Sequence, residues 1–178
     1  MSASLDDFSD PNLLDGLTGW DLDRVRAWRD GAQAVEGGLS YVRRMVQGRL
    51  DIVGAELTRR RKGGDPGDLS GLIAQLPDLL SDPDRGPTAS PRSPRQLDLG
   101  AVPDELAAEL DQIVDTDALA DLPGLDTEAL DKMAARLVDF ERWISERRHV
   151  VQGVMDTLQA EIARRYRDGE ATVDGLLE

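Results

Sequence analysis

EGGLSYVRRMVQGRLD, residues 36–51, places polar side chains along one line of a helix and apolar side chains along another. ERWISERRHVVQGVMD, residues 141–156, repeats the polar pattern 105 positions later. Both stretches obey the spacing E-x3-S-x2-R-x3-Q-x3-D, although most of the residues between the polar positions differ. The sequence therefore contains an internal repeat, and the fold must accommodate two related helical segments.

Each repeat lies in a longer run whose apolar residues advance in steps of three and four, except for one step of seven from Ile144 to Val151 in the second run. This pattern predicts a narrow apolar stripe that one helix buries against another, as in a coiled coil. We expect an all-α protein in which two long helices form an intramolecular coiled coil; the length of the connection leaves parallel and antiparallel pairing open. The stripes consist of Leu39, Val42, Val46, Leu50, Val53 and Leu57 in the first run, and of Met133, Leu137, Phe140, Ile144, Val151, Met155, Leu158 and Ile162 in the second.

Capping and breaking residues set the expected boundaries. Asp21 favours the start of the first long helix and Gly63 its end, while Asp126 or Thr127 caps the second. Residues 97–131 hold eleven acids and no base, with a short helix expected over Asp104–Val114. The predicted segments are a loose or only locally helical N-terminal segment (1–18), a long helix (19–63), a short helix (64–81), a proline-rich disordered linker (82–96), an acidic segment with a short helix (97–126), a long helix (127–169) and a tail (170–178).

Composition excludes several classes of function. The net charge of −14 disfavours direct binding to DNA or to an anionic membrane, and favours a basic protein partner. The chain has no cysteine, a single histidine and no clustered metal ligands, so we expect neither an enzyme nor a metal site. Neither a secretory signal nor a membrane-spanning apolar run is present in this sequence, which predicts a cytoplasmic protein.

The repeated polar residues share one face of each helix. At ~100° per residue, the five residues of a repeat fall within an arc of roughly 80° and along a line roughly 22 Å long, beside the apolar stripe. Weak pairs on a solvated surface explain one such line, but not serine and glutamine recurring in register. We call the two sets the first ladder (Glu36, Ser40, Arg43, Gln47 and Asp51) and the second ladder (Glu141, Ser145, Arg148, Gln152 and Asp156).

The ladders carry the groups that bind a guanine nucleotide. A carboxylate accepts hydrogen bonds from the N1–H and amino edge of guanine, and arginine donates to guanine O6 and N7 or to phosphate. Two related helices favour a ligand with two-fold symmetry, and no phosphate-binding glycine loop is present. Gly48 and Gly153 recur beside the ladders, although glycine costs up to ~1 kcal/mol inside a helix, which is consistent with a cleared surface.

Two complete copies of this motif on two long helices resemble RsiG, a family of actinobacterial anti-sigma factors that bind cyclic di-GMP and hold the sporulation sigma factor WhiG inactive. The resemblance covers all ten motif positions. It implies an antiparallel coiled coil that binds a cyclic di-GMP dimer through both ladders and sequesters a sigma factor of WhiG type. The acidic segment would then face a basic surface of that sigma factor.

Two alternatives remain open. The ladders are also what a structural or adaptor coiled coil would use to set helix register without a ligand. An enzyme that hydrolyses a cyclic dinucleotide would need metals and an enclosing pocket, which a helix face beside a coiled coil does not offer.

Overall fold

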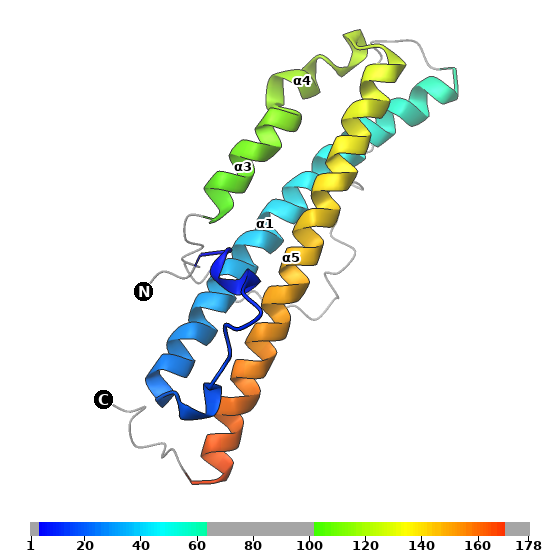
Figure 1. The fold of residues 1–178 in the computed structure, drawn as a ribbon. Coiled ribbons are helices and arrows are strands. Elements are labelled where there is room, and N and C mark those ends of the chain that lie inside the picture. Colours follow the sequence, from blue (N-terminus) through cyan, green and yellow to red (C-terminus); the bar gives the residue numbers. More distant parts are fainter. Residues whose placement is uncertain (1–3, 64–101, 170–178) are drawn as a thin grey trace, which may run out of the picture.

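The computed structural model describes residues 4–63 and 102–169. Two long helices, α1 (Leu22–Arg61) and α5 (Thr127–Arg167), lie side by side and run in opposite directions (Figure 1). All regular secondary structure in these two ranges is helical. This confirms the predicted all-α fold with an intramolecular antiparallel helix pair.

The two long helices begin and end in matching ways. The side chain of Asp21 accepts a hydrogen bond from the backbone N–H of Arg24 at 2.7 Å, and Asp126 accepts one from Ala129 at the same distance. Asp126, and not Thr127, is therefore the cap of α5. Beyond the other ends, Gly63 and Gly169 adopt positive φ angles of 78° and 74°, which terminate a helix at low steric cost.

A strict seven-residue column forms the centre of the helix pair. Every member of this column is at most 1% exposed, and burying each of its valine, leucine and isoleucine side chains stabilises the fold by roughly 1.5–3 kcal/mol. The other predicted stripe residues are buried or pack against this core. The column consists of Val25, Ala32, Leu39, Val46 and Val53 in α1, and of Leu130, Leu137, Ile144, Val151 and Leu158 in α5.

The shorter elements pack on the long helices (Figure 1). Two 3-10 helices, η1 (Asp7–Ser9) and η2 (Leu17–Gly19), precede α1. The helices α3 (Val102–Ile113) and α4 (Thr116–Ala120) and the 3-10 helix η3 (Leu122–Gly124) precede α5. Leu106, Leu110 and Val114 are buried in the main core, which is why this acidic segment is ordered against the long helices.

The described part of the N-terminal segment, residues 4–18, contains short local helices, as one of the two predicted alternatives has it, and it packs on the helix pair. Phe8 is buried in the main core and meets Trp28 edge to face, with ring centroids 5.8 Å apart. Arg147 donates a hydrogen bond to Ser9 Oγ at 2.6 Å. Apolar packing and polar contacts therefore both hold the segment on the helix pair. The short helix at Asp104–Val114 corresponds to α3, and α4 was not predicted.

The remaining predictions fall elsewhere in the chain. The short helix over 64–81, the linker over 82–96, the start of the acidic segment at 97–101 and the tail over 170–178 lie outside the described residues. Within the described ranges, no helix has a stretch both long and apolar enough to span a bilayer.

The packing of α3 leaves the ladder side of the helix pair open. Arg49 donates hydrogen bonds from α1 to the carboxylate of Asp111, at 2.6 Å, and to the carbonyl oxygen of Val114. Arg49 follows Arg43 by six residues, which turns its side chain about 120° around the helix axis. The ladders therefore lie on a different side of α1 from the side that α3 covers.

Candidate functional site

Two long helices bring parts of the two ladders together. The sequence predicted no partner on the other helix for any of the ten ladder residues, because the pairing depends on the register of the hairpin. The structure places Arg43 against Glu141 and Arg148 against Glu36, so the two ladders interlock at their centres.

The first network links Arg43 to the second ladder. Arg43 Nε donates to Glu141 Oε1 at 2.8 Å and to Ser145 Oγ at 3.0 Å. Ser145 Oγ donates in turn to Glu141 Oε1 at 2.9 Å. One carboxylate oxygen thus receives a guanidinium and a hydroxyl, and the three side chains hold one another in position.

The second network is the counterpart of the first. Arg148 Nε donates to Glu36 Oε1 at 2.8 Å, and Ser40 Oγ donates to the same oxygen at 2.9 Å. Gln152 Nε2 adds a third hydrogen bond to it at 3.2 Å. The site therefore has approximate two-fold symmetry, with the glutamine contact present in one half.

The position of the symmetry axis follows from these pairs. Glu36 faces Arg148 and Arg43 faces Glu141, so the midpoint lies beside Ser40 on α1. The equivalent midpoint on α5 lies beside Ser145. The serines are consequently closest to the axis.

Three ladder residues stay outside both networks. Within the described part of the chain, Gln47, Asp51 and Asp156 make no hydrogen bond or ion pair through their side chains, and both aspartates are exposed. From the axis to either aspartate is 11 to 12 residues of helix, or roughly 17 Å. The two ladders are thus bonded to each other at their centres, whereas the side chains at their outer ends have no partner among the described residues.

The arginines keep most of their donors available. Among the described residues, Arg43 and Arg148 each use only Nε, so the two terminal nitrogens of each guanidinium have no protein acceptor. Their side chains remain 33% and 30% exposed. A guanidinium held at Nε with its terminal nitrogens exposed is suited to donate to two acceptor atoms of a ligand.

The electrostatics of the first network favour a charged carboxylate. Desolvation raises the pKa of Glu141, but hydrogen bonds from Arg43 and Ser145 and the charge of Arg43 outweigh it, so the pKa lies below its ordinary value. Glu141 therefore stays an acceptor at neutral pH.

Packing within the described chain does not require the glycines beside the ladders. A Cβ atom added to Gly48 or Gly153 would meet no other atom within 4 Å. Each glycine still costs roughly 1 kcal/mol relative to alanine in a helix. The recurrence of both fits a surface that something outside this part of the chain approaches closely.

Sequence reasoning missed a second repeated polar group at the helix ends. We define the Glu56 cluster as Glu56, Arg59 and Arg60, and the Glu161 cluster as Glu161, Arg164 and Arg165. Their agreement at the 105-residue offset was visible in the sequence. Basic residues are common in the last turn of a helix, where they offset the helix dipole, so this agreement alone indicates no specific role.

Two equivalent polar networks, related by a pseudo-two-fold axis on one face of a two-helix coiled coil, define the class of protein: an all-helical protein with a symmetric polar face. The family model described as RsiG-like matches residues 11–80 and 116–178, and the chain belongs to that family of regulatory anti-sigma factors. No curated protein sequence matches the chain. The family match covers both ladders and both end clusters.

Proposed function

We propose that this protein is a cyclic di-GMP-responsive anti-sigma factor. In this proposal a cyclic di-GMP dimer binds the open face through both ladders, and the loaded protein sequesters a sporulation sigma factor of WhiG type and blocks its transcription. The observation that carries the proposal is the pair of guanidinium groups, Arg43 and Arg148, held at Nε with their terminal nitrogens unpaired among the described residues.

The arrangement of donors and acceptors suits a guanine dinucleotide. The terminal nitrogens of Arg43 and Arg148 would donate to guanine O6 and N7 or to phosphate. Glu36 and Glu141 would accept from guanine N–H groups, and the serines would complete contacts near the axis. Because cyclic di-GMP itself has two-fold symmetry, its halves can make equivalent contacts with both ladders.

The open ends of the array suit a ligand larger than one dinucleotide. Gln47, Asp51 and Asp156 lie away from the central networks on both sides of the axis. In our proposal Gln47 and Gln152 contact the outer parts of the bound dimer, and the two aspartates bind its outermost guanine edges. A dimer reaches these positions more readily than a single dinucleotide does.

The exposed acids beside the helix pair supply a surface for the sigma factor. Glu105 and Glu109 on α3 and Asp117 on α4 are exposed and form no ion pair within the described chain. Their negative charge would complement a basic surface of the partner and accelerate its association. We propose that this acidic surface contributes to binding the sigma factor.

Isothermal titration of the full-length chain with cyclic di-GMP tests ligand binding. We expect saturable binding that weakens at least ~100-fold in Arg43→Ala/Arg148→Ala, since each arginine supplies charge-assisted hydrogen bonds. Arg44→Ala/Arg167→Ala removes the same charge from exposed positions of the same helices and should bind like the parent. Equal binding by both double variants would contradict the proposal.

Co-purification with a WhiG-type sigma factor tests the partner. We expect capture to depend on cyclic di-GMP and to weaken in Glu105→Lys/Glu109→Lys/Asp117→Lys. The control variant Asp23→Lys/Asp30→Lys/Glu146→Lys makes the same change of charge at exposed positions on the two long helices. Ligand-independent capture would contradict the switch, and equal capture by both triple variants would contradict the acidic surface.

The alternative function, a structural or adaptor coiled coil without a ligand, is favoured by one observation. The ladders do form cross-helix ion pairs, as a register-setting role requires. That alternative predicts no heat on titration and a large loss of stability in Arg43→Ala/Arg148→Ala. Partly exposed pairs of this kind contribute at most ~1 kcal/mol each, so we expect the double variant to stay folded.

A further inference from the structure

The seven-residue column of the core continues into an arginine on both helices. Val53 is followed seven residues later by Arg60, and Leu158 by Arg165. Arg165 is only 6% exposed, so this charged side chain lies where the coiled-coil pattern calls for an apolar one. A buried charge at such a position requires specific partners.

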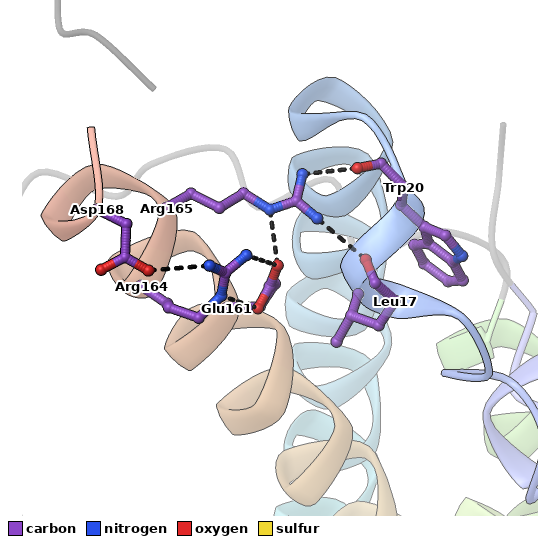
Figure 2. Close-up of polar contacts among 6 residues, drawn as sticks. All are labelled: Leu17, Trp20, Glu161, Arg164, Arg165 and Asp168. Atoms are coloured by element: carbon purple, nitrogen blue, oxygen red, sulfur yellow. Dashed lines mark hydrogen bonds and ion pairs between the residues drawn. The ribbon is translucent and has the colours of Figure 1, made fainter. Parts of the chain in front are cut away.

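The Glu161 cluster provides those partners at one end of the hairpin (Figure 2). Arg165 Nε donates to Glu161 Oε1 at 2.7 Å, and its terminal nitrogens donate to the backbone carbonyls of Trp20 and Leu17 at 2.6 and 3.0 Å. Arg164 also donates to both oxygens of Glu161. The end of α5 is thereby bonded to the turn that starts α1.

The Glu56 cluster repeats this arrangement at the other end. Arg60 Nε donates to Glu56 Oε1 at 2.7 Å, and its terminal nitrogens donate to the carbonyls of Leu125 and Leu122 at 2.7 and 2.8 Å. Arg59 donates to both oxygens of Glu56. The end of α1 is thus bonded to the turn that starts α5, and the acceptors are the residues equivalent to Trp20 and Leu17.

The apolar column cannot by itself choose the register of the hairpin. Its members recur every seven residues on both helices, so sliding one helix by seven residues again places apolar side chains opposite apolar side chains. Such a slip would separate Arg43 from Glu141 by about 10 Å along the axis. Contacts outside the apolar column must therefore select the observed register.

The end clusters select the same register in which the ladders face each other. The residue numbers add up to 184 or 185 in four cross-helix pairs: Arg60 with Leu125, Arg43 with Glu141, Arg148 with Glu36, and Arg165 with Trp20. The ion pairs of the ladders are partly exposed, whereas Glu56 and Glu161 are buried. The buried pair of clusters is better suited to fix the register.

We propose that Arg60 and Arg165 are positioning residues for the nucleotide site: they lock the hairpin in the register that opposes the two ladders. This inference rests on the proposed function for its ligand, but not for the register itself. These contacts do not involve Arg43 or Arg148, so the terminal nitrogens of both arginines stay available to the ligand.

The test combines a distance measurement with ligand binding. Arg60→Leu/Arg165→Leu continues the apolar column, so helix pairing should persist while register selection is lost. The chain has no cysteine, so nitroxide labels on Gln33→Cys/Ala135→Cys, two exposed positions, report the register by pulsed electron paramagnetic resonance. Arg61→Leu/Arg167→Leu makes the same change at exposed neighbouring positions and is the matched control.

We expect one inter-label distance in the parent and in the control, and additional distances displaced by about 10 Å along the axis in Arg60→Leu/Arg165→Leu. Affinity for cyclic di-GMP should fall at least ~10-fold in that variant, with partial recovery in Arg60→Lys/Arg165→Lys. If the leucine variant loses its helical circular dichroism, the distances in the lysine variant decide the question.

The inference would be overturned if the leucine and lysine variants of Arg60 and Arg165 showed only the inter-label distance of the parent and bound cyclic di-GMP with the affinity of the parent. If the parent itself binds no cyclic di-GMP, the proposed function fails, and the distance measurement still decides whether the clusters set the register.

Discussion

The ladders and the end clusters use the same two charged residue types at two depths of the same helix pair. In the ladders, the side chains of Glu36 and Glu141 are 21% and 24% exposed, and each receives an arginine from the opposite helix. In the end clusters, the side chains of Glu56 and Glu161 are 3% and 8% exposed, and their arginines come from the same helix. The difference teaches that burial and acceptor type separate a structural arginine from one available to a ligand.

The two kinds of arginine also differ in how many of their nitrogens donate to acceptors within the protein. Arg165 spends all three nitrogens on protein oxygens, two of them backbone carbonyls. Arg43 spends only Nε among the described residues. Fully satisfied guanidinium groups stabilise a fold, whereas partly satisfied and exposed ones retain capacity for another molecule.

The largest expected effect breaks the clusters and spares the ladders. Glu56→Gln/Glu161→Gln should lower the free energy of unfolding by about 2 kcal/mol per site, because the arginines around each buried carboxylate lose a charged acceptor. Glu36→Gln/Glu141→Gln should cost less than ~1 kcal/mol per site, because those groups are partly exposed. Urea denaturation followed by circular dichroism measures both, and an equal loss in the two variants would contradict the comparison.

Lowering the pH should also reduce the stability of the fold through the end clusters. A hydrogen bond from Arg59 lowers the pKa of Glu56 to about 2, and one from Arg164 lowers the pKa of Glu161 to about 2. Groups with depressed pKa values contribute stability that is full above their ordinary pKa of 4.5 and is lost as the pH falls toward 2. Unfolding measured from pH 6 to 2 should show this loss, and Glu56→Gln/Glu161→Gln should flatten the profile; an identical slope in parent and variant would rule out these carboxylates.

A ligand should stabilise the parent through the ladders. Cyclic di-GMP at 100 times its dissociation constant should raise the free energy of unfolding by about 2.7 kcal/mol. Arg43→Ala/Arg148→Ala should lose this increment, whereas Arg44→Ala/Arg167→Ala should keep it. Thermal unfolding with and without ligand is the measurement, and a ligand shift that survives loss of both ladder arginines would place the site elsewhere.

The smallest expected effect has the opposite sign. Gly48→Ala and Gly153→Ala should each stabilise the fold by up to ~1 kcal/mol, because alanine is the better helix former and its Cβ meets no neighbour. We expect the same variants to weaken capture of the sigma factor if these glycines clear its binding surface. Stabilisation without any change in ligand or partner binding would show that the glycines serve neither.

Much of the fold follows from local sequence patterns. The alternation of apolar residues predicted both long helices and their stripes, because this signal acts within a few residues. Asp21 predicted the start of the first helix, and the start of the second was left between Asp126 and Thr127. The antiparallel direction came from the family resemblance, since chain length left it open. The packing of Phe8 against Trp28 was not predicted, because one aromatic residue in a short acidic segment gives no periodic signal.

The sequence predicted only part of the arrangement of the candidate site. The motif gave all ten ladder residues, but the pairing of Arg43 with Glu141 depends on register, which no spacing within one helix reveals. The roles of Arg60 and Arg165 were missed for a different reason. Their acceptors at the start of the opposite helix are backbone carbonyls, which have the same chemistry whatever residue bears them and so leave no mark in the sequence.

The pseudo-two-fold axis beside Ser40 and Ser145 has a consequence for how the site responds to protein concentration. A symmetric site built from two separate copies exists only while the copies are associated, so it dissolves on dilution. Here both half-sites belong to one polypeptide, and the site forms by a unimolecular step. In the proposed function, the fraction of the protein that is bound to cyclic di-GMP would therefore depend on the nucleotide concentration and not on the association of two copies of the protein.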